Sequence, residues 1–164
     1  MLDGRRPAPD HAFARTLREL ESGSGVWAGS LAPDRERQEA FAEICCRLRS
    51  RGIRTIVFLP PLATPVLGAL ADRNGGDAGW LSALRQGLLD CGVESMDFSD
   101  PRVYGSGDCE MMDGLHGGDV IGASLVRDMG DRQPWLRDML HREYLSHVLR
   151  ERRGLAAVPD ERLT

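Results

Sequence analysis

An aspartate and a histidine stand three residues apart, as Asp113 and His116, in the glycine-rich segment CEMMDGLHGGD. In a turn that leads into a helix, the carboxylate can accept the imidazole Nδ1–H, which leaves Nε2 to take a proton from a nucleophile. Glycines at 114, 117 and 118 allow a tight turn and let a ligand come close. The residues therefore suggest a catalytic Asp–His pair, and the alternative is a turn aspartate beside a surface histidine.

A metal site is the second chemical interpretation of the same segment. Cys109, Asp113, His116 and Asp119 could all be ligands and lie close together in the sequence. The spacing matches neither an H-E-x-x-H motif nor an EF-hand loop. A thiolate among carboxylates is also unusual for a hard cation. We therefore expect no metal at this segment, and the chemistry of an Asp–His pair requires no organic cofactor.

Two units of the same kind precede this segment and would position it. A helix begins after the N-cap Asp34 with apolar residues at helical spacing (Phe41, Ile44, Cys45 and Leu48), ends at Gly52, and is followed by a buried strand over 53–59. A second helix, capped by Asp77 and ended by Gly92, precedes a strand over 93–98. Helix–glycine–strand twice over predicts a parallel sheet with crossover helices, and sites in such sheets gather at the carboxyl ends of the strands.

The remaining elements are expected to be helices and loops. Helices are predicted over 9–21, from Asp119 to Met129, and from about Pro134 to Arg153. A loop with one helical turn is expected at 60–76, and a short strand is possible at 26–28. Two clear strands are few for an α/β sheet, which usually has about four to six. The prediction is a single α/β domain over 1–164, with a core at about 34–130 and an amphipathic C-terminal helix at 131–154.

Composition narrows the classes of function. The chain has 164 residues and a net charge of -4, and all 21 basic residues are arginine, so neither a basic nucleic-acid surface nor a lysine Schiff base is expected. No stretch approaches the roughly 20 apolar residues of a membrane helix. The four cysteines lack C-x-x-C spacing, and the adjacent Cys45 and Cys46 suggest buried thiols rather than a disulfide framework. A reduced, cytoplasmic protein is expected if the chain is a complete gene product.

Three segments together resemble the SGNH (GDSL-like) hydrolases and acyltransferases. They are LPP after the first strand, DFSDP after the second, and DCEMMDGLHGGD, and they look like the C-terminal half of bacterial members related to the alginate O-acetylation and D-alanyl transfer proteins. The resemblance covers about 34–130 and is most specific at 108–119. It implies an SGNH- or flavodoxin-like fold and a Ser–His–Asp triad, in which His116 is the general base and Asp113 orients it.

The nucleophile of such a triad is not evident. The family's serine follows the first strand in a Gly-Asp-Ser block, and this chain has no such block. The nearest serines, Ser24 and Ser30 among them, follow a helical pattern rather than a strand. Cys109, four residues before Asp113, is another weak candidate, because a nearby histidine can activate a thiol. The serine is therefore borrowed from another polypeptide, replaced, or lost.

The sequence predicts an esterase or O-acyltransferase that acts through Asp113 and His116. Pro60, Pro61, Gly114 and Gly117 are the candidates for binding a substrate, which would be an ester or acyl donor, with a carrier protein as one possible source. The alternatives are one half of a split acyltransferase and a non-catalytic partner-binding module. The apolar stripe of the C-terminal helix would then dock a partner subunit or a second copy, or else cover a face of the sheet.

Overall fold

The computed structural model describes residues 11–28, 34–73 and 79–151, and most of them are helical. Its helices, apart from short 3₁₀ turns, are α1 (Ala14–Ser22), α2 (Arg35–Ser50), α3 (Thr64–Arg73), α4 (Gly79–Leu89), α5 (Asp119–Arg132), α6 (Pro134–Arg137) and α7 (Arg142–Arg150). Its strands are β1 (Val57–Leu59) and β2 (Ser95–Asp97). None of the helices in these described ranges is both long enough and apolar enough to cross a membrane.

The two strands form a parallel sheet, as the repeated helix–glycine–strand pattern predicts. Val57 pairs with Ser95 and Leu59 with Asp97, and α4 is the crossover between the strands. The Asp34 side chain caps α2 by accepting the Arg37 N–H at 3.2 Å, whereas the predicted cap Asp77 lies outside the described residues. Both strands are shorter than predicted, because within the described ranges each strand has one neighbouring strand and the flanking residues have no further strand to pair with.

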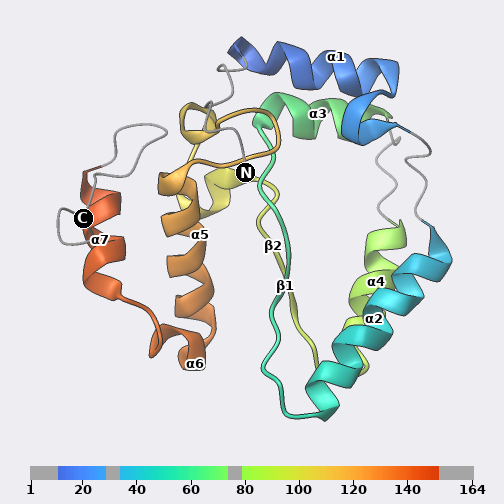
Figure 1. Ribbon diagram of the computed structural model, residues 1–164, viewed down its shortest axis with the longest axis vertical. Coiled ribbons are helices and arrows are strands. Elements are labelled where there is room, and N and C mark those ends of the chain that lie inside the picture. The colour runs from blue at the N-terminus through green and yellow to red at the C-terminus, as the bar shows by residue number, and fades with distance from the viewer. Residues whose placement is uncertain (1–10, 29–33, 74–78, 152–164) are drawn as a thin grey trace, which may run out of the picture.

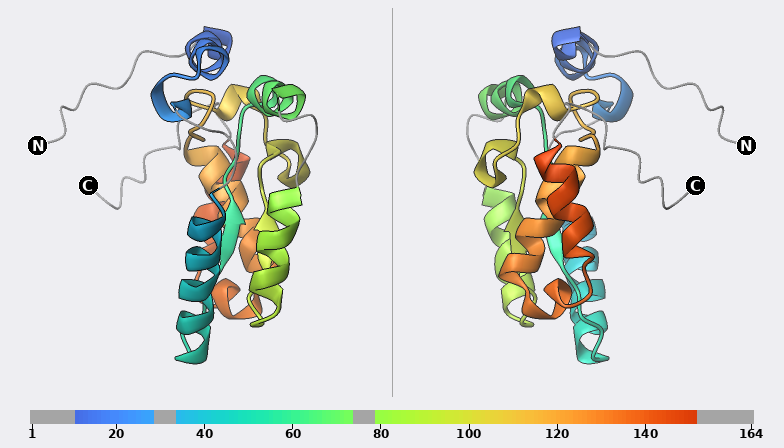
Figure 2. Two further views of the ribbon diagram at one scale, coloured as in Figure 1. Left: turned by 90° about the vertical axis from the view of Figure 1, so that its right-hand side faces the viewer. Right: turned by 90° about the vertical axis from the view of Figure 1, so that its left-hand side faces the viewer.

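Helices cover the two faces of the sheet (Figure 2). On one face α2 and α4 pack with the strands around Cys45, Leu88 and Val93. On the other face α5 contributes Ile121 and Leu125 to the main core. This core also contains Met96 of β2 and two residues that follow the strand, Phe98 and Tyr104. The molecule is therefore a three-layer α/β structure with a sheet of minimal width in the middle.

Helices α1 and α3 lie across one end of the sheet, above the carboxyl ends of both strands (Figure 1). Leu20 of α1 and Val66 of α3 are almost completely buried there. The Arg73 guanidinium at the end of α3 also donates a hydrogen bond to the carbonyl of Leu20. The predicted loop at 60–76 is thus mostly a three-turn helix, and the possible strand at 26–28 is instead a 3₁₀ turn over Gly25–Trp27.

The predicted long helix from Pro134 to Arg153 is wrong in the described part of the chain. It is broken into α6 and α7, and α7 folds back along α5, where Val148 is buried against Val120 and Ala123. Gly130 permits the turn, because a Cβ there would lie 2.6 Å from Leu140 Cδ1. The apolar residues of α7 therefore pack on α5, whereas Leu136 of α6 packs against the main core. Burial of α7 against α5 is the physical reason that the helix breaks.

A second correction concerns the cysteines. Cys46 of α2 and Cys91, just after α4, form a disulfide, whereas the sequence suggested reduced thiols. Cys45 is a buried free thiol, as expected, and burial raises its pKa. Adjacent positions on a helix point about 100° apart, so one cysteine faces the core while the other reaches the neighbouring helix. The disulfide joins the C-terminal half of α2 to the residues just after α4, and both helices end at the side of the molecule opposite to α1 and α3 (Figure 1).

Candidate active site

Two loops meet at the carboxyl ends of the strands. Residues 60–63 follow β1 and residues 98–118 follow β2. The Leu62 N–H donates to the Ser99 carbonyl at 2.9 Å, and the Ala63 N–H donates to the Gly114 carbonyl at 3.1 Å. The Asp108 carboxylate accepts the N–H of Thr64, at the start of α3, at 2.8 Å. These bonds fix the segment containing Asp113 and His116 at the sheet end where the sequence predicted a site.

The segment from Glu110 to Gly118 folds into a small hairpin. The Met112 N–H donates to the His116 carbonyl at 2.8 Å, and the Gly118 N–H donates to the Glu110 carbonyl at 2.8 Å. The reversal between Met112 and His116 is tight, and it places Asp113 and His116 on the two sides of the turn. Local hydrogen bonding therefore holds both side chains before any ligand binds.

The Asp113 carboxylate orients the His116 ring. His116 Nδ1 lies 3.0 Å from both Asp113 Oδ1 and Oδ2. Oδ1 also accepts the backbone N–H groups of Leu115 and His116, each at 2.8 Å. Because an ionised carboxylate has no hydrogen to donate, Nδ1 carries the hydrogen of this contact. The neutral ring then has Nε2 as its acceptor, which is the tautomer that a general base needs.

The charge on Asp113 is stabilised by these same contacts. Partial burial by itself would raise the pKa of Asp113, but the hydrogen bonds from Leu115 N–H, the His116 ring and His116 N–H together lower it. The Asp113 side chain is 15% exposed, whereas the His116 side chain is 67% exposed. A largely covered carboxylate thus holds an imidazole that remains open to a substrate or a partner.

None of the candidate nucleophiles is hydrogen-bonded to the His116 ring among the described residues. Ser24 Oγ pairs with Ser22 Oγ at 2.8 Å at the end of α1. Cys109 is an exposed free thiol. Ser30 lies outside the described residues. The part of the chain that the structure describes therefore presents a base and its orienting carboxylate without the third member of a triad.

The four residues expected to bind substrate have different surroundings. Pro60 is exposed and Pro61 is buried, both directly after β1. A Cβ on Gly114 would lie 2.5 Å from Thr16 Cγ2 and 2.7 Å from Val66 Cγ2, and one on Gly117 would lie 2.5 Å from Ile121 Cγ2. Both glycines are thus required by packing inside the protein, and their contact with a ligand stays a prediction.

Helix α1 supplies two contacts that the sequence did not indicate. The Thr16 hydroxyl accepts the Gly114 N–H at 3.3 Å, and Arg15 lies 3.7 Å from Asp113 Oδ2. Thr16 is buried and 98 residues away from Gly114 in the sequence. No motif indicates either residue, because this pairing depends on how α1 crosses the end of the sheet.

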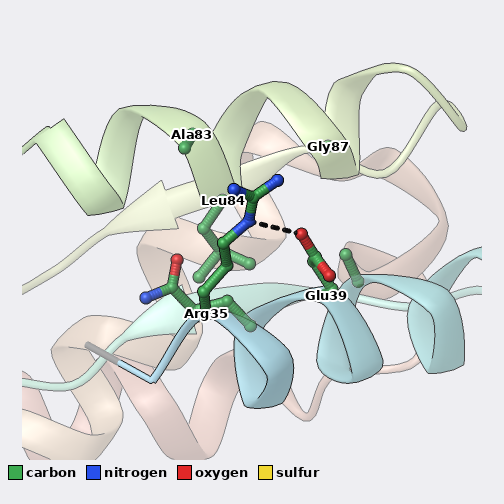
Figure 3. Close-up of a pocket in the computed structure, with 7 residues that line it drawn as sticks. Arg35, Glu39, Ala83, Leu84 and Gly87 are labelled. Atoms are coloured by element: carbon green, nitrogen blue, oxygen red, sulfur yellow. Dashed lines mark hydrogen bonds and ion pairs between the residues drawn. The ribbon is translucent and has the colours of Figure 1, made fainter.

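The described residues form no cluster of metal ligands, and a groove elsewhere in the molecule is lined by other residues than Asp113 and His116. Within the described ranges no three His, Cys, Asp or Glu side chains are arranged to hold a metal ion. An open groove of about 460 Å³ lies elsewhere, between α2 and α4 (Figure 3). At its rim the Arg35 guanidinium donates to Glu39 at 2.7 Å, so its charge is already paired. The groove contains no group suited to acyl chemistry.

Comparison with known proteins gave no matching family model, no similar curated protein and no similar solved structure. The function of this site must therefore be inferred from its own geometry.

Proposed function

We propose that the chain carries the base and orienting carboxylate of an esterase or O-acyltransferase of SGNH type. The observation that supports this is the Asp113 carboxylate on His116 Nδ1 at 3.0 Å, beside a ring that is largely exposed. A hydroxyl group attacks the acyl carbon while Nε2 takes its proton, and the protonated ring then returns that proton to the leaving oxygen. The resemblance of the sequence segments points to the same chemistry.

The nucleophilic hydroxyl of this reaction comes from outside the described residues in the form of the proposal that we favour. With no hydroxyl on the His116 ring among the described residues, a partner polypeptide that supplies the serine fits the geometry better than Ser24 or Cys109. In this form the chain is one half of a split acyltransferase, whose substrates are an ester or acyl donor and an acceptor. A non-catalytic partner-binding module is the second candidate. A missing hydroxyl is also expected if the Asp113–His116 loop keeps its structure from a catalytic ancestor but no longer catalyses a reaction.

An added alcohol can stand in for the missing hydroxyl in a direct test. The protein is incubated with p-nitrophenyl acetate and increasing glycerol, and p-nitrophenolate release is followed. The wild type should release it faster as glycerol rises, because Nε2 takes the proton of the attacking hydroxyl. The glycerol-dependent rate should disappear in His116→Ala and fall in Asp113→Asn, whose ring loses its charged partner.

His147→Gln is the matched control, since this histidine lies on α7. It should retain the wild-type response to glycerol. An equal glycerol-dependent rate in the wild type and in His116→Ala would reject the enzymatic proposal and leave the binding module.

The disulfide bears on where the protein works. Structural disulfides persist in oxidising compartments and are rare in the cytoplasm. We propose that the protein works in an oxidising compartment and not in the cytoplasm expected from the sequence, and the Cys46–Cys91 bond supports this proposal. Mass spectrometry of alkylated protein from its native cells would test this, since full alkylation of both cysteines without reduction would exclude the bond.

A further inference from the structure

We propose that the free edge of β1 binds a β-strand of a partner polypeptide, and that this strand runs parallel to β1. The sheet has two strands, so β1 pairs with β2 on one side and with no strand of the described residues on the other. An unpaired edge presents N–H and C=O groups that form a template for an incoming strand. The proposal rests on the sheet and not on the proposed function.

The polar groups of Phe58 face the free edge. The Phe98 N–H donates to the Leu59 carbonyl at 3.2 Å, so the backbone groups of Leu59 point toward β2. Successive residues of a strand direct their N–H and C=O groups to opposite sides, which turns those of Phe58 away from β2. Phe58 is therefore the residue whose amide would report an added strand.

The position of α2 gives the direction of the missing strand. Helix α4 connects β1 to β2 on one face of the sheet, and α2 lies on that same face, joined to the end of α4 by the Cys46–Cys91 disulfide. Crossover connections between parallel strands are right-handed in nearly all cases. Two connections whose helices lie on the same face of the sheet therefore step from strand to strand in the same direction across the sheet.

If the connection from a preceding strand through α2 to β1 is also right-handed, that strand lies on the free side of β1 and runs parallel to it. In Figure 2, α2 lies at the β1 side of the sheet and α4 at the β2 side, as this arrangement requires. The described residues that precede α2 do not supply such a strand, because Gly25–Trp27 is a 3₁₀ turn packed against α1. Among the described residues, α2 is thus a crossover helix without its first strand.

Exposed apolar side chains lie on both sides of this edge. Phe58 is 42% exposed on the face covered by α5, where it meets Phe98 edge-on with ring centroids 6.2 Å apart. On α2, Phe41 is 42% exposed and Ile44 is 57% exposed. At about 100° per residue both lie on the side of α2 away from Cys46, which faces α4. An added strand would cover apolar surface that the two-stranded sheet leaves open.

A strand in this position would end next to the candidate active site. Adjacent strands lie about 4.8 Å apart, and a parallel strand has its carboxyl end at the same edge as β1. The loop after β1 is bonded there to the Asp113–His116 hairpin through the Ala63 N–H and the Gly114 carbonyl. If the proposed function also holds, the residue after the partner's strand is well placed to bring the missing hydroxyl.

A second copy of the chain fits the edge less well. Two β1 edges related by a two-fold axis perpendicular to the sheet would pair antiparallel, whereas the helices call for a parallel neighbour. We therefore assign the edge to a different polypeptide.

The test uses a short strand as the partner's stand-in. A capped peptide of alternating valine and threonine, with a lysine at each end, is titrated into the isotopically labelled protein. Amide hydrogen exchange is measured for Phe58 and Val57. The peptide should slow exchange of the Phe58 amide about tenfold when 90% of the protein is bound. The Val57 amide, which points to β2, should change little.

A peptide with proline at two central positions is the matched control and should leave both amides unchanged, because proline cannot donate to a ladder. Unchanged exchange at Phe58 over the whole titration would overturn the proposal, and so would equal slowing by the proline peptide. A concentration-dependent dimer in sedimentation, lost in Phe58→Arg, would overturn it in favour of a second copy. Each readout is independent of the esterase assay, so the two proposals fail separately.

Discussion

The carboxyl end of β1 and its free edge differ sharply in how fully their backbone groups are hydrogen-bonded and their apolar side chains are buried. At the carboxyl end, the Asp113–His116 hairpin is held by its own backbone hydrogen bonds, by one to the loop after β1, and by α1 packed against Gly114. At the free edge, Phe58 and Ile44 remain exposed although they lie in the α/β part of the chain. The contrast indicates that the described residues hold the Asp113–His116 hairpin in place by themselves, whereas they leave one edge of the supporting sheet without a neighbouring strand.

The largest expected difference is between the two phenylalanines of the sheet. Phe98→Ala should cost about 3–5 kcal/mol, because it removes a fully buried ring from the main core. Phe58→Ala should cost about 1–2 kcal/mol, mainly from its edge contact with Phe98. Urea unfolding of both variants measures the comparison. Equal losses would mean that the β1 edge is covered in solution.

The disulfide is expected to have the next largest effect, because it secures α2 where the sheet gives it little support. The double variant Cys46→Ser/Cys91→Ser should lose roughly 2–4 kcal/mol of unfolding free energy. Cys109→Ser, at an exposed free thiol, is the matched control and should stay close to the wild type. If the double variant is as stable as the control, α2 is held by its packing alone.

Packing of α1 and α3 on the hairpin can be tested at a glycine. Gly114→Ala should destabilise by about 1–3 kcal/mol, since its Cβ would overlap Thr16 and Val66. Gly107→Ala places its Cβ where no atom lies within 4 Å and should be nearly neutral. Unfolding curves of the two variants distinguish them, and a neutral Gly114→Ala would show that α1 does not lie against the hairpin.

The smallest expected effect is the pH dependence contributed by Asp113. Its pKa is lowered in the folded protein, so its contribution to stability is present above the unfolded value of about 3.9 and is lost as pH falls through the lower folded pKa. Asp113→Asn should therefore be less stable than the wild type near neutral pH, and the gap should narrow in acid. A gap that stays constant from neutral to acidic pH would contradict the lowered pKa.

Local patterns predicted much of the fold around this site. The Asp34 cap, the left-handed Gly52 and Gly92, the two parallel strands and the helix from Asp119 all have short-range signals in the chain. The contact between Asp113 and His116 was also predictable, because a three-residue turn brings the two side chains together. Catalysis by these two residues could not be predicted in the same way, because the spacing of Asp113 and His116 carries no information about the nucleophile.

The helical spacing of Phe41, Ile44, Cys45 and Leu48 shows the limit of such patterns. Periodicity identifies the apolar side of α2, yet only Cys45 of this group is fully buried, because burial also needs a neighbouring layer to pack against. The Cys46–Cys91 bond escaped prediction for a related reason: its partners are 45 residues apart and meet only after both helices pack on one face.

The sequence by itself thus determined the elements, the parallel pairing and the Asp–His contact, because each depends on residues close together in the chain. Only the tertiary structure decided that α1 packs on the hairpin through Thr16 and Gly114, that α7 folds back onto α5, and that no strand of the described residues pairs with the second edge of β1. These features depend on which surfaces meet across long separations, and that is settled by the burial and steric fit of whole elements rather than by any local pattern.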